Sequence, residues 1–102
     1  MEKIIKMVKG TNKRFPNGVE PFQIVTRLLE ECGEVASEVN HREKTGIKIQ
    51  KYGEPSKEKL ANEIRQALQA LMQIVVYYDI EIELDNSIDQ SLERMRNEGL
   101  IE

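Results

Sequence analysis

Apolar residues recur at spacings of three and four along three long stretches, a pattern typical of helices with one apolar face. In residues 21–42 this face would consist of Phe22, Val25, Leu29, Cys32, Ala36 and Val39. In residues 57–79 it would consist of Leu60, Ile64, Ala67, Leu68, Leu71, Val75 and Tyr78. In residues 83–98 it would consist of Leu84, Ile88, Leu92 and Met95. We therefore predict three helices that turn these faces inward, so that Cys32 is a core residue, and a short helix over residues 2–9 before them.

Glycine and proline residues separate these helices. Gly10 and the Pro-Asn-Gly run at 16–18 predict one loop, and the basic, glycine-containing segment 43–55 predicts another. Ser56 is a suitable N-cap for the helix that follows. No alternation typical of strands competes with the helical pattern, so the sequence predicts an all-α, four-helix-type bundle forming one domain over residues 1–102.

The second long helix is apolar around most of its circumference over residues 67–78. Such a helix is buried on more than one side. A chain of 102 residues also has a thin core. We expect a homo-oligomer, with one very central helix in a monomer as the alternative.

Composition narrows the class of protein. The net charge of −3 argues against a binder of nucleic-acid polymers, which usually carries a basic surplus. A single cysteine excludes an intrachain disulfide framework, and no apolar run is long enough for a membrane span. The N-terminus has no apolar signal core, so we expect a cytoplasmic protein with no membrane partner.

Four polar side chains flank the predicted apolar faces in pairs. Glu31 and Glu34 are three residues apart, as are Glu63 and Gln66, so each pair lies on one part of its helix. If the two helices pack antiparallel, both pairs can meet at one rim of the bundle. Converging carboxylates are costly without a cation, and Mg²⁺ prefers oxygen ligands. The alternative is that these are solvated surface residues among the 18 acidic ones.

The same residues resemble the signatures of the MazG-like nucleotide pyrophosphohydrolase family. Residues 30–34, Glu-Glu-Cys-Gly-Glu, look like the Glu-Glu-x-x-Glu motif, and Glu63-Ile64-Arg65-Gln66 lies where the family has Glu-x-x-Asp. Twenty-eight residues separate the two motifs, at the long end of the family range. The resemblance extends over about residues 20–98.

This resemblance implies a helical enzyme that hydrolyses a nucleoside triphosphate to the monophosphate and pyrophosphate. It implies Mg²⁺, with Mn²⁺ as an alternative, and a homodimer or homotetramer with the site near a subunit interface. By carry-over, Glu31, Glu34 and Glu63 are the catalytic residues and metal ligands. One of them would orient or deprotonate the attacking water.

The sequence departs from the family at two positions. Gln66 replaces an aspartate, so its amide oxygen would bind the metal without charge, and Glu38, one turn after Glu34, could supply the missing carboxylate. Ser91 stands where the family tends to have a lysine. The following residues remain as candidate phosphate contacts: Lys59, Arg94, Lys48 and Lys51.

Each of these basic residues has a plainer interpretation. Lys59 could instead form an i,i+4 pair with Glu63, and Lys48 and Lys51 could belong to a solvated loop. His41, the only histidine, would favour the dipole at the end of its helix rather than act in catalysis.

Three functions remain open at this point. The first is an active, Mg²⁺-dependent nucleoside triphosphate pyrophosphohydrolase, favoured by Glu31, Glu34 and Glu63. The second is a catalytically impaired, nucleotide-binding or regulatory oligomer, favoured by the changes at Gln66 and Ser91. The third is a helical oligomerisation protein without a ligand site.

Overall fold

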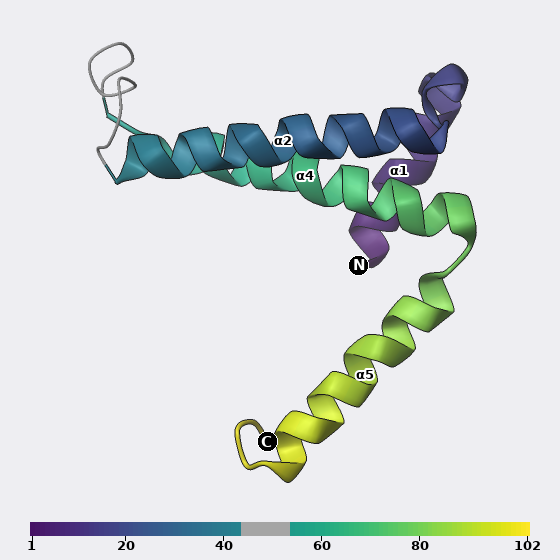
Figure 1. The fold of residues 1–102 in the computed structure, drawn as a ribbon, viewed down its shortest axis with the longest axis vertical. Helices are drawn as coiled ribbons and strands as arrows, with labels where there is room; N and C mark the ends of the chain where they lie inside the picture. The colour runs from purple at the N-terminus through teal and green to yellow at the C-terminus, as the bar shows by residue number, and fades with distance from the viewer. Residues whose placement is uncertain (44–53) are drawn as a thin grey trace.

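The computed structural model describes residues 1–43 and 54–102, and every regular element in these ranges is a helix, with no strand in either. The prediction of an all-α protein is confirmed. The elements in chain order are α1 (Glu2–Arg14), the 3-10 turn η1 (Pro16–Gly18), α2 (Pro21–Arg42), α4 (Lys57–Tyr78) and α5 (Glu81–Asn97). Helices α2 and α4 lie side by side, α1 crosses α4, and α5 projects away from the other three (Figure 1).

The two long helices begin and end close to their predicted positions. Side-chain caps on their first turns explain where they begin. The Glu20 carboxylate accepts hydrogen bonds from the backbone N–H groups of Phe22 and Gln23, at 3.1 and 3.2 Å. The Ser56 hydroxyl accepts one from the backbone N–H of Lys59, at 3.0 Å, which confirms Ser56 as the N-cap of α4. These bonds satisfy donors that have no partner within the helix.

Helix α1 is longer than predicted, since it runs to Arg14 and passes through Gly10 without a loop. Contacts with α4 account for the difference. Val8 is fully buried against α4, and the side chains of Thr11 and Asn12 bond to glutamines of that helix. This packing outweighs the low helix propensity of Gly10.

The apolar core lies where α1 crosses the C-terminal half of α4. Val8, Met72 and Val75 are its buried members. Partly buried side chains from α1, α4 and the start of α5 pack around them: Ile4, Ile5, Val76 and Leu84. Only this first turn of α5 is anchored to the core.

The apolar residues predicted to face inward from α2 are exposed, so that prediction is wrong for the single chain. Phe22 is 81% exposed and Leu29 69%, and Cys32 is exposed as well. The buried side of α2 carries Ile24, Glu38 and His41. The 3.6-residue period identifies which residues share a side of a helix, but it does not identify which side a neighbour covers.

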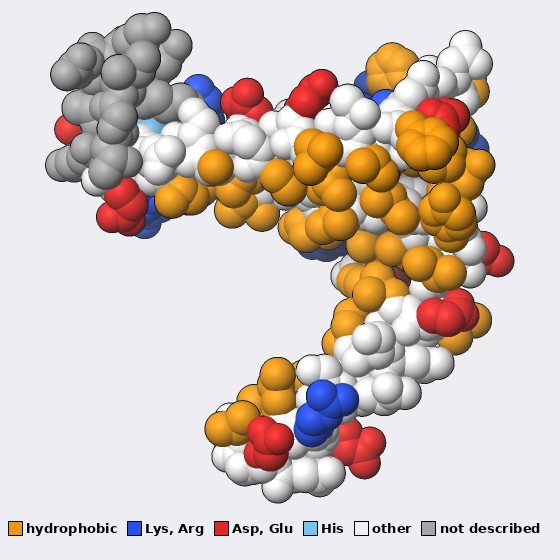
Figure 2. All heavy atoms as spheres, viewed as in Figure 1, with side chains coloured by type: hydrophobic (Ala, Val, Ile, Leu, Met, Phe, Trp, Pro, Cys, Tyr) orange, Lys and Arg blue, Asp and Glu red, His pale blue; other side chains and the backbone are white. Residues whose placement is uncertain are grey.

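Helix α4 exposes apolar residues next to those of α2. Together they form what we call the apolar face, which spreads over α2 and α4 (Figure 2). Its residues are Phe22, Val25, Leu29, Cys32, Ala36 and Val39 of α2, and Ile64, Leu68 and Leu71 of α4. Ile88 and Met95 of α5, also predicted to face inward, are 40% and 41% exposed.

A tight turn directs α5 away from α4. Asp79 has a φ of 54°, a left-handed conformation that aspartate tolerates better than most residues. The backbone N–H of Asp79 donates to the Val76 carbonyl, and that of Ile80 donates to the Val75 carbonyl. The direction in which α5 leaves is therefore fixed by hydrogen bonds.

None of the helices in residues 1–43 and 54–102 combines the length and the apolar composition that crossing a bilayer requires.

The position of Gly10 inside α1 gives a stability prediction. A Cβ atom there would meet nothing within 4 Å. Gly10→Ala should therefore raise the free energy of unfolding by about 1 kcal/mol, since alanine is the better helix former. Urea denaturation followed by circular dichroism measures the change.

Gly99→Ala is the matched control, because Gly99 has a φ of +75°. Alanine there should lower the free energy of unfolding by about 1 kcal/mol. Destabilisation by Gly10→Ala would contradict an α1 that is continuous through residue 10.

Candidate functional site

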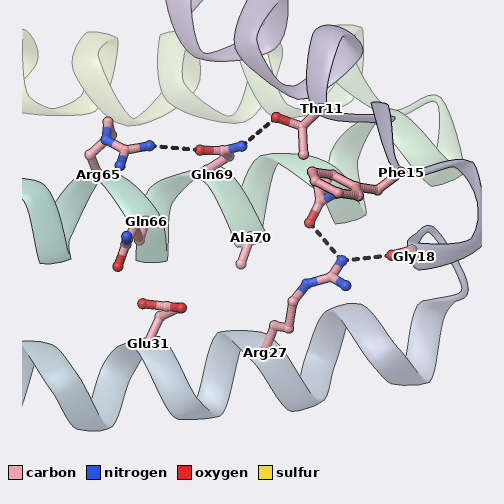
Figure 3. A pocket seen from close by; sticks show the side chains of 10 residues that line it. Thr11, Phe15, Gly18, Arg27, Glu31, Arg65, Gln66, Gln69 and Ala70 are labelled. Atoms are coloured by element: carbon pink, nitrogen blue, oxygen red, sulfur yellow. Dashed lines mark hydrogen bonds between the residues drawn. The ribbon is translucent and has the colours of Figure 1, made fainter. Parts of the chain in front are cut away.

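Two glutamates and a glutamine meet between α2 and α4. When the amide of Gln66 is oriented to satisfy its neighbours, its nitrogen donates to a Glu31 oxygen at 2.9 Å and to a Glu63 oxygen at 3.1 Å. Figure 3 shows the amide end of Gln66 directed toward the Glu31 carboxylate across the gap between the two helices. The structure thus brings together three of the residues expected to form the site.

The electrostatic environment of Glu31 is unfavourable to its charge. Burial raises the pKa of Glu31 above 4.5, and the carboxylates of Glu63, Glu34 and Glu30 raise it further, in that order of size. The positive charge of Arg65 lowers the pKa of Glu31, but by less than the other groups raise it. Repulsion of this kind is relieved when a cation binds among the carboxylates.

Glu34 does not join Glu31 and Glu63 at the centre of the site. It is an exposed residue on α2, although its charge still reaches Glu31. Within residues 1–43 and 54–102, no three or more histidine, cysteine, aspartate or glutamate side chains come together as metal-ion ligands. The oxygen donors that do converge are two carboxylates and one amide.

Glu38 lies at a different place along the α2–α4 contact. Its side chain is 1% exposed, with one oxygen 3.5 Å from Nζ of Lys59 and the other 3.8 Å from Nδ1 of His41. Lys59 therefore has an ion partner in Glu38, a pairing that its i,i+4 spacing to Glu63 did not predict. His41 lies in the last turn of α2, as the sequence predicted, and is buried beside this carboxylate.

Two arginines line the same pocket as Glu31 and Gln66. The pocket has a volume of about 320 Å³ and lies among α1, α2 and α4, with the side chains of Arg27 and Arg65 on its wall. Among the residues that the structure describes, neither guanidinium forms an ion pair. Both guanidinium groups can therefore attract an anion.

Neutral groups hold the Arg27 guanidinium in place. It donates to the carbonyl of Gly18 at 2.7 Å and to the Gln73 side-chain oxygen at 3.0 Å (Figure 3). Gln73 in turn donates to Asn12 of α1 at 3.0 Å. Gly18 allows this approach, since a Cβ on it would lie 3.3 Å from Nη1 of Arg27.

A parallel set of bonds holds the Arg65 guanidinium. It donates to Gln69 and to Asn62, each at 2.9 Å, and Gln69 donates to Thr11 of α1 at 2.8 Å. Two glutamines one turn apart on α4 therefore fix both arginines and tie α1 to the pocket. A guanidinium has five N–H donors, so each keeps donors for a ligand.

The other predicted phosphate contacts lie elsewhere. Arg94 is on α5, which projects away from the pocket, and Lys48 and Lys51 lie outside the described residues. Ser91 is on α5 as well.

The sequence prediction did not assign Arg27 or Arg65 to the site. A signal for Arg27 was present, since it precedes Glu31 by one helical turn and shares its side of α2. Arg65 lies between Glu63 and Gln66 in sequence but turns toward α1, and nothing in the periodicity indicates this. Phe15 also lines the pocket, with its side chain 59% exposed.

Comparison of the chain with models of protein families, with curated proteins and with solved structures finds no match.

The raised pKa of Glu31 gives a pH-dependent prediction. Ionising Glu31 costs more in the folded chain than in the unfolded one, so the penalty is absent below the ordinary value of 4.5 and complete above the raised value. Glu31→Gln should therefore raise the melting temperature at about pH 7 and leave it nearly unchanged at about pH 3.5. Thermal unfolding in metal-free buffer measures both.

Glu83→Gln, at an exposed position on α5, is the control for removing one negative charge. At neutral pH, Glu83→Gln should change the melting temperature by less than Glu31→Gln does. Equal effects of the two substitutions would mean that Glu31 experiences no special repulsion.

Proposed function

We propose that this chain is a MazG-like, Mg²⁺-dependent pyrophosphohydrolase of the cytoplasm, which hydrolyses a nucleoside or deoxynucleoside triphosphate to the monophosphate and pyrophosphate. The observation that carries the proposal is that one pocket brings carboxylates and guanidinium groups together. Glu31 and Gln66 line it, with Glu63 bonded to the same amide, and Arg27 and Arg65 line it as well. A metal–triphosphate complex carries the two opposite charges that such a pocket can bind.

The donors that converge between α2 and α4 fit a hard divalent cation. Glu31 and Glu63 supply carboxylate oxygens from facing helices, and the repulsion that raises the pKa of Glu31 favours a positive neighbour. Mg²⁺ is usually held by one or two carboxylates, with waters and substrate phosphates completing its shell. Two carboxylates are therefore a sufficient protein contribution.

The residues of the pocket would divide the work of hydrolysis. When bound, Mg²⁺ neutralises phosphate oxygens and lowers the pKa of a coordinated water. Arg27 and Arg65 would hold the polyphosphate through charge-assisted hydrogen bonds. One of the two carboxylates, Glu31 or Glu63, would accept a proton from the water that attacks the α-phosphorus, while pyrophosphate leaves with the electrons of the broken P–O bond.

The proposal also includes assembly as a homodimer or homotetramer, supported by the apolar side chains that α2 and α4 leave exposed. Glu34 and Glu38 are retained as outer carboxylates that contribute to the negative potential, and Lys59 as the ion partner of Glu38.

One contact favours the alternative of a catalytically impaired nucleotide-binding protein. The Gln66 amide nitrogen donates to both carboxylates and so supplies the positive partner that a metal would otherwise provide. Its oxygen can face a cation only after a half-turn of the amide that breaks both hydrogen bonds. Mg²⁺ must therefore compete with Gln66, which an aspartate at this position would not require.

Release of pyrophosphate from a panel of nucleoside and deoxynucleoside triphosphates tests the proposed activity. With Mg²⁺ present, at least one substrate should yield equal amounts of monophosphate and pyrophosphate. Glu63→Gln should lower the rate by about a hundredfold or more, because the site loses one of its two converged charges. Gln66→Asp should lower the Mg²⁺ concentration needed for half-maximal rate.

Activity that appears only in Gln66→Asp would instead favour the impaired, nucleotide-binding alternative. If no triphosphate is hydrolysed or bound by either protein, the proposed function is wrong.

The role of Arg27 can be tested without metal or turnover. Arg27→Met should weaken binding of inorganic tripolyphosphate by about ten- to a hundredfold, the equivalent of losing about 1.5–3 kcal/mol of charged hydrogen bonds. Isothermal titration calorimetry in the presence of a chelator measures the affinity. Arg14→Met, at an exposed position on α1, is the control and should bind as the wild type does.

A further inference from the structure

Helix α1 contributes uncharged groups to the wall of the charged pocket. Thr11, near the C-terminal end of α1, and Phe15, directly after it, line the pocket. Neither side chain carries a charge that would attract a phosphate, and the proposed chemistry gives α1 no role. The hydrogen bonds of α1 nevertheless lead to both guanidinium groups of the pocket, those of Arg27 and Arg65, which we call the anion site.

One path of hydrogen bonds runs from Thr11 to Arg65. The Gln69 amide nitrogen donates to the Thr11 hydroxyl at 2.8 Å, and the Gln69 oxygen accepts from Arg65 at 2.9 Å (Figure 3). Because its nitrogen is bonded to α1, the amide turns its oxygen toward the guanidinium. The reversed amide would set N–H donors against one another. Thr11 therefore determines which end of Gln69 faces Arg65.

A second path runs from Asn12 to Arg27, one helical turn further along α4. The Gln73 amide nitrogen donates to Oδ1 of Asn12 at 3.0 Å, and its oxygen accepts from Arg27 at 3.0 Å. Gln73 is only 6% exposed, so water cannot readily replace a lost partner. The other acceptor for Arg27 is the Gly18 carbonyl, which belongs to the turn η1 that follows α1. Both acceptors therefore depend on where α1 lies.

The remaining anchors of α1 on the described chain are modest. Among the described residues of α1 only Val8 is buried, and Ile4 and Ile5 are partly buried against the core. The Lys9 ammonium lies 4.0 Å from a Glu81 oxygen, but both side chains are largely exposed, so this ion pair adds little. The two glutamine contacts are therefore a substantial part of what positions α1 on α4.

From these contacts we infer that α1 and the anion site form one coupled unit. Thr11 and Asn12 are positioning residues, which act through the two glutamines to hold the two guanidinium groups where a polyphosphate can meet both. Because such coupling is reciprocal, a bound polyphosphate in turn holds α1 on α4. The inference rests on the phosphate contacts of the proposed function, but not on its metal or its hydrolysis.

Thr11→Val tests the first path, because it removes the acceptor for Gln69 with no change of charge and almost none of size. It should weaken binding of inorganic tripolyphosphate by about three- to tenfold, measured by isothermal titration calorimetry in the presence of a chelator. In the Arg65→Met background, Thr11→Val should change the affinity by less than about twofold, since its effect needs the guanidinium.

Two threonine variants are the controls. Thr11→Ser keeps the hydroxyl and should bind tripolyphosphate as the wild type does. Thr26→Val removes a hydroxyl that bonds to the Phe22 carbonyl within α2, and it should also leave the affinity unchanged.

Hydrogen exchange tests the reciprocal effect. With tripolyphosphate at about 100 times its Kd, the backbone amides of α1 should exchange at least about tenfold more slowly, because a bound ligand opposes the undocking of α1. The amides of residues 88–97, in the part of α5 that projects away from the pocket, should exchange at nearly the same rate with and without the ligand (Figure 1).

An absent effect of Thr11→Val, or an equal one in the wild-type and Arg65→Met backgrounds, overturns the positioning role. Exchange in α1 that the ligand leaves unchanged overturns the coupling. A wild type that binds no tripolyphosphate overturns the inference together with the phosphate contacts of the proposed function. Binding with both effects, but without hydrolysis of any triphosphate, would contradict only the proposed activity.

Discussion

The surface of α4 is shared among three neighbours, and this division determines the rest of the structure. One side receives α1, through the contact of Val8 with Met72 and the bonds from Gln69 and Gln73. A second side faces α2 across Glu63 and Gln66. The third side carries Ile64, Leu68 and Leu71 and is uncovered in the single chain.

The contact between α2 and α4 is unusually polar for two long helices packed side by side. Glu31, Glu38 and Arg27 of α2 lie where aliphatic side chains would stabilise the pair better. Burying charged and amide groups costs free energy unless each finds a partner. These residues do find partners, but such contacts add little net stabilisation, so the apolar contact at the α1 crossing contributes more to the stability of the described chain.

The free-energy cost of burying polar groups between α2 and α4 is understandable if these groups bind a ligand. Carboxylates that repel one another, and arginines held by neutral amides rather than by acids, are poised for ligands of opposite charge. We propose that stability and function are separated on α4: the charged pocket on one side binds a metal–triphosphate, and the apolar face on the opposite side provides the assembly that the pocket cannot.

The sequence predicted the helices well because their periodicity and caps are local properties. The i,i+3 spacing, together with antiparallel packing of the two helices, predicted that Glu31, Glu34, Glu63 and Gln66 would meet. Glu31, Glu63 and Gln66 do approach one another, whereas Glu34 is exposed. The sequence could not predict which side of α2 is covered, because Phe22 and Leu29 share a face whether that face meets α4 or a second chain. The length of α1 was missed for a related reason: contacts with α4, distant in sequence, carry the helix through Gly10.

The most direct test of this account is a crystal structure with Mn²⁺ and a nucleoside triphosphate analogue whose α–β bridge cannot be hydrolysed. The account predicts an anomalous Mn²⁺ peak between the carboxylates of Glu31 and Glu63, with the Gln66 amide oxygen turned toward it and the phosphates extending to Arg27 and Arg65. Mn²⁺ bound elsewhere, or an analogue that leaves the Gln66 hydrogen bonds and both arginines unchanged, would contradict it.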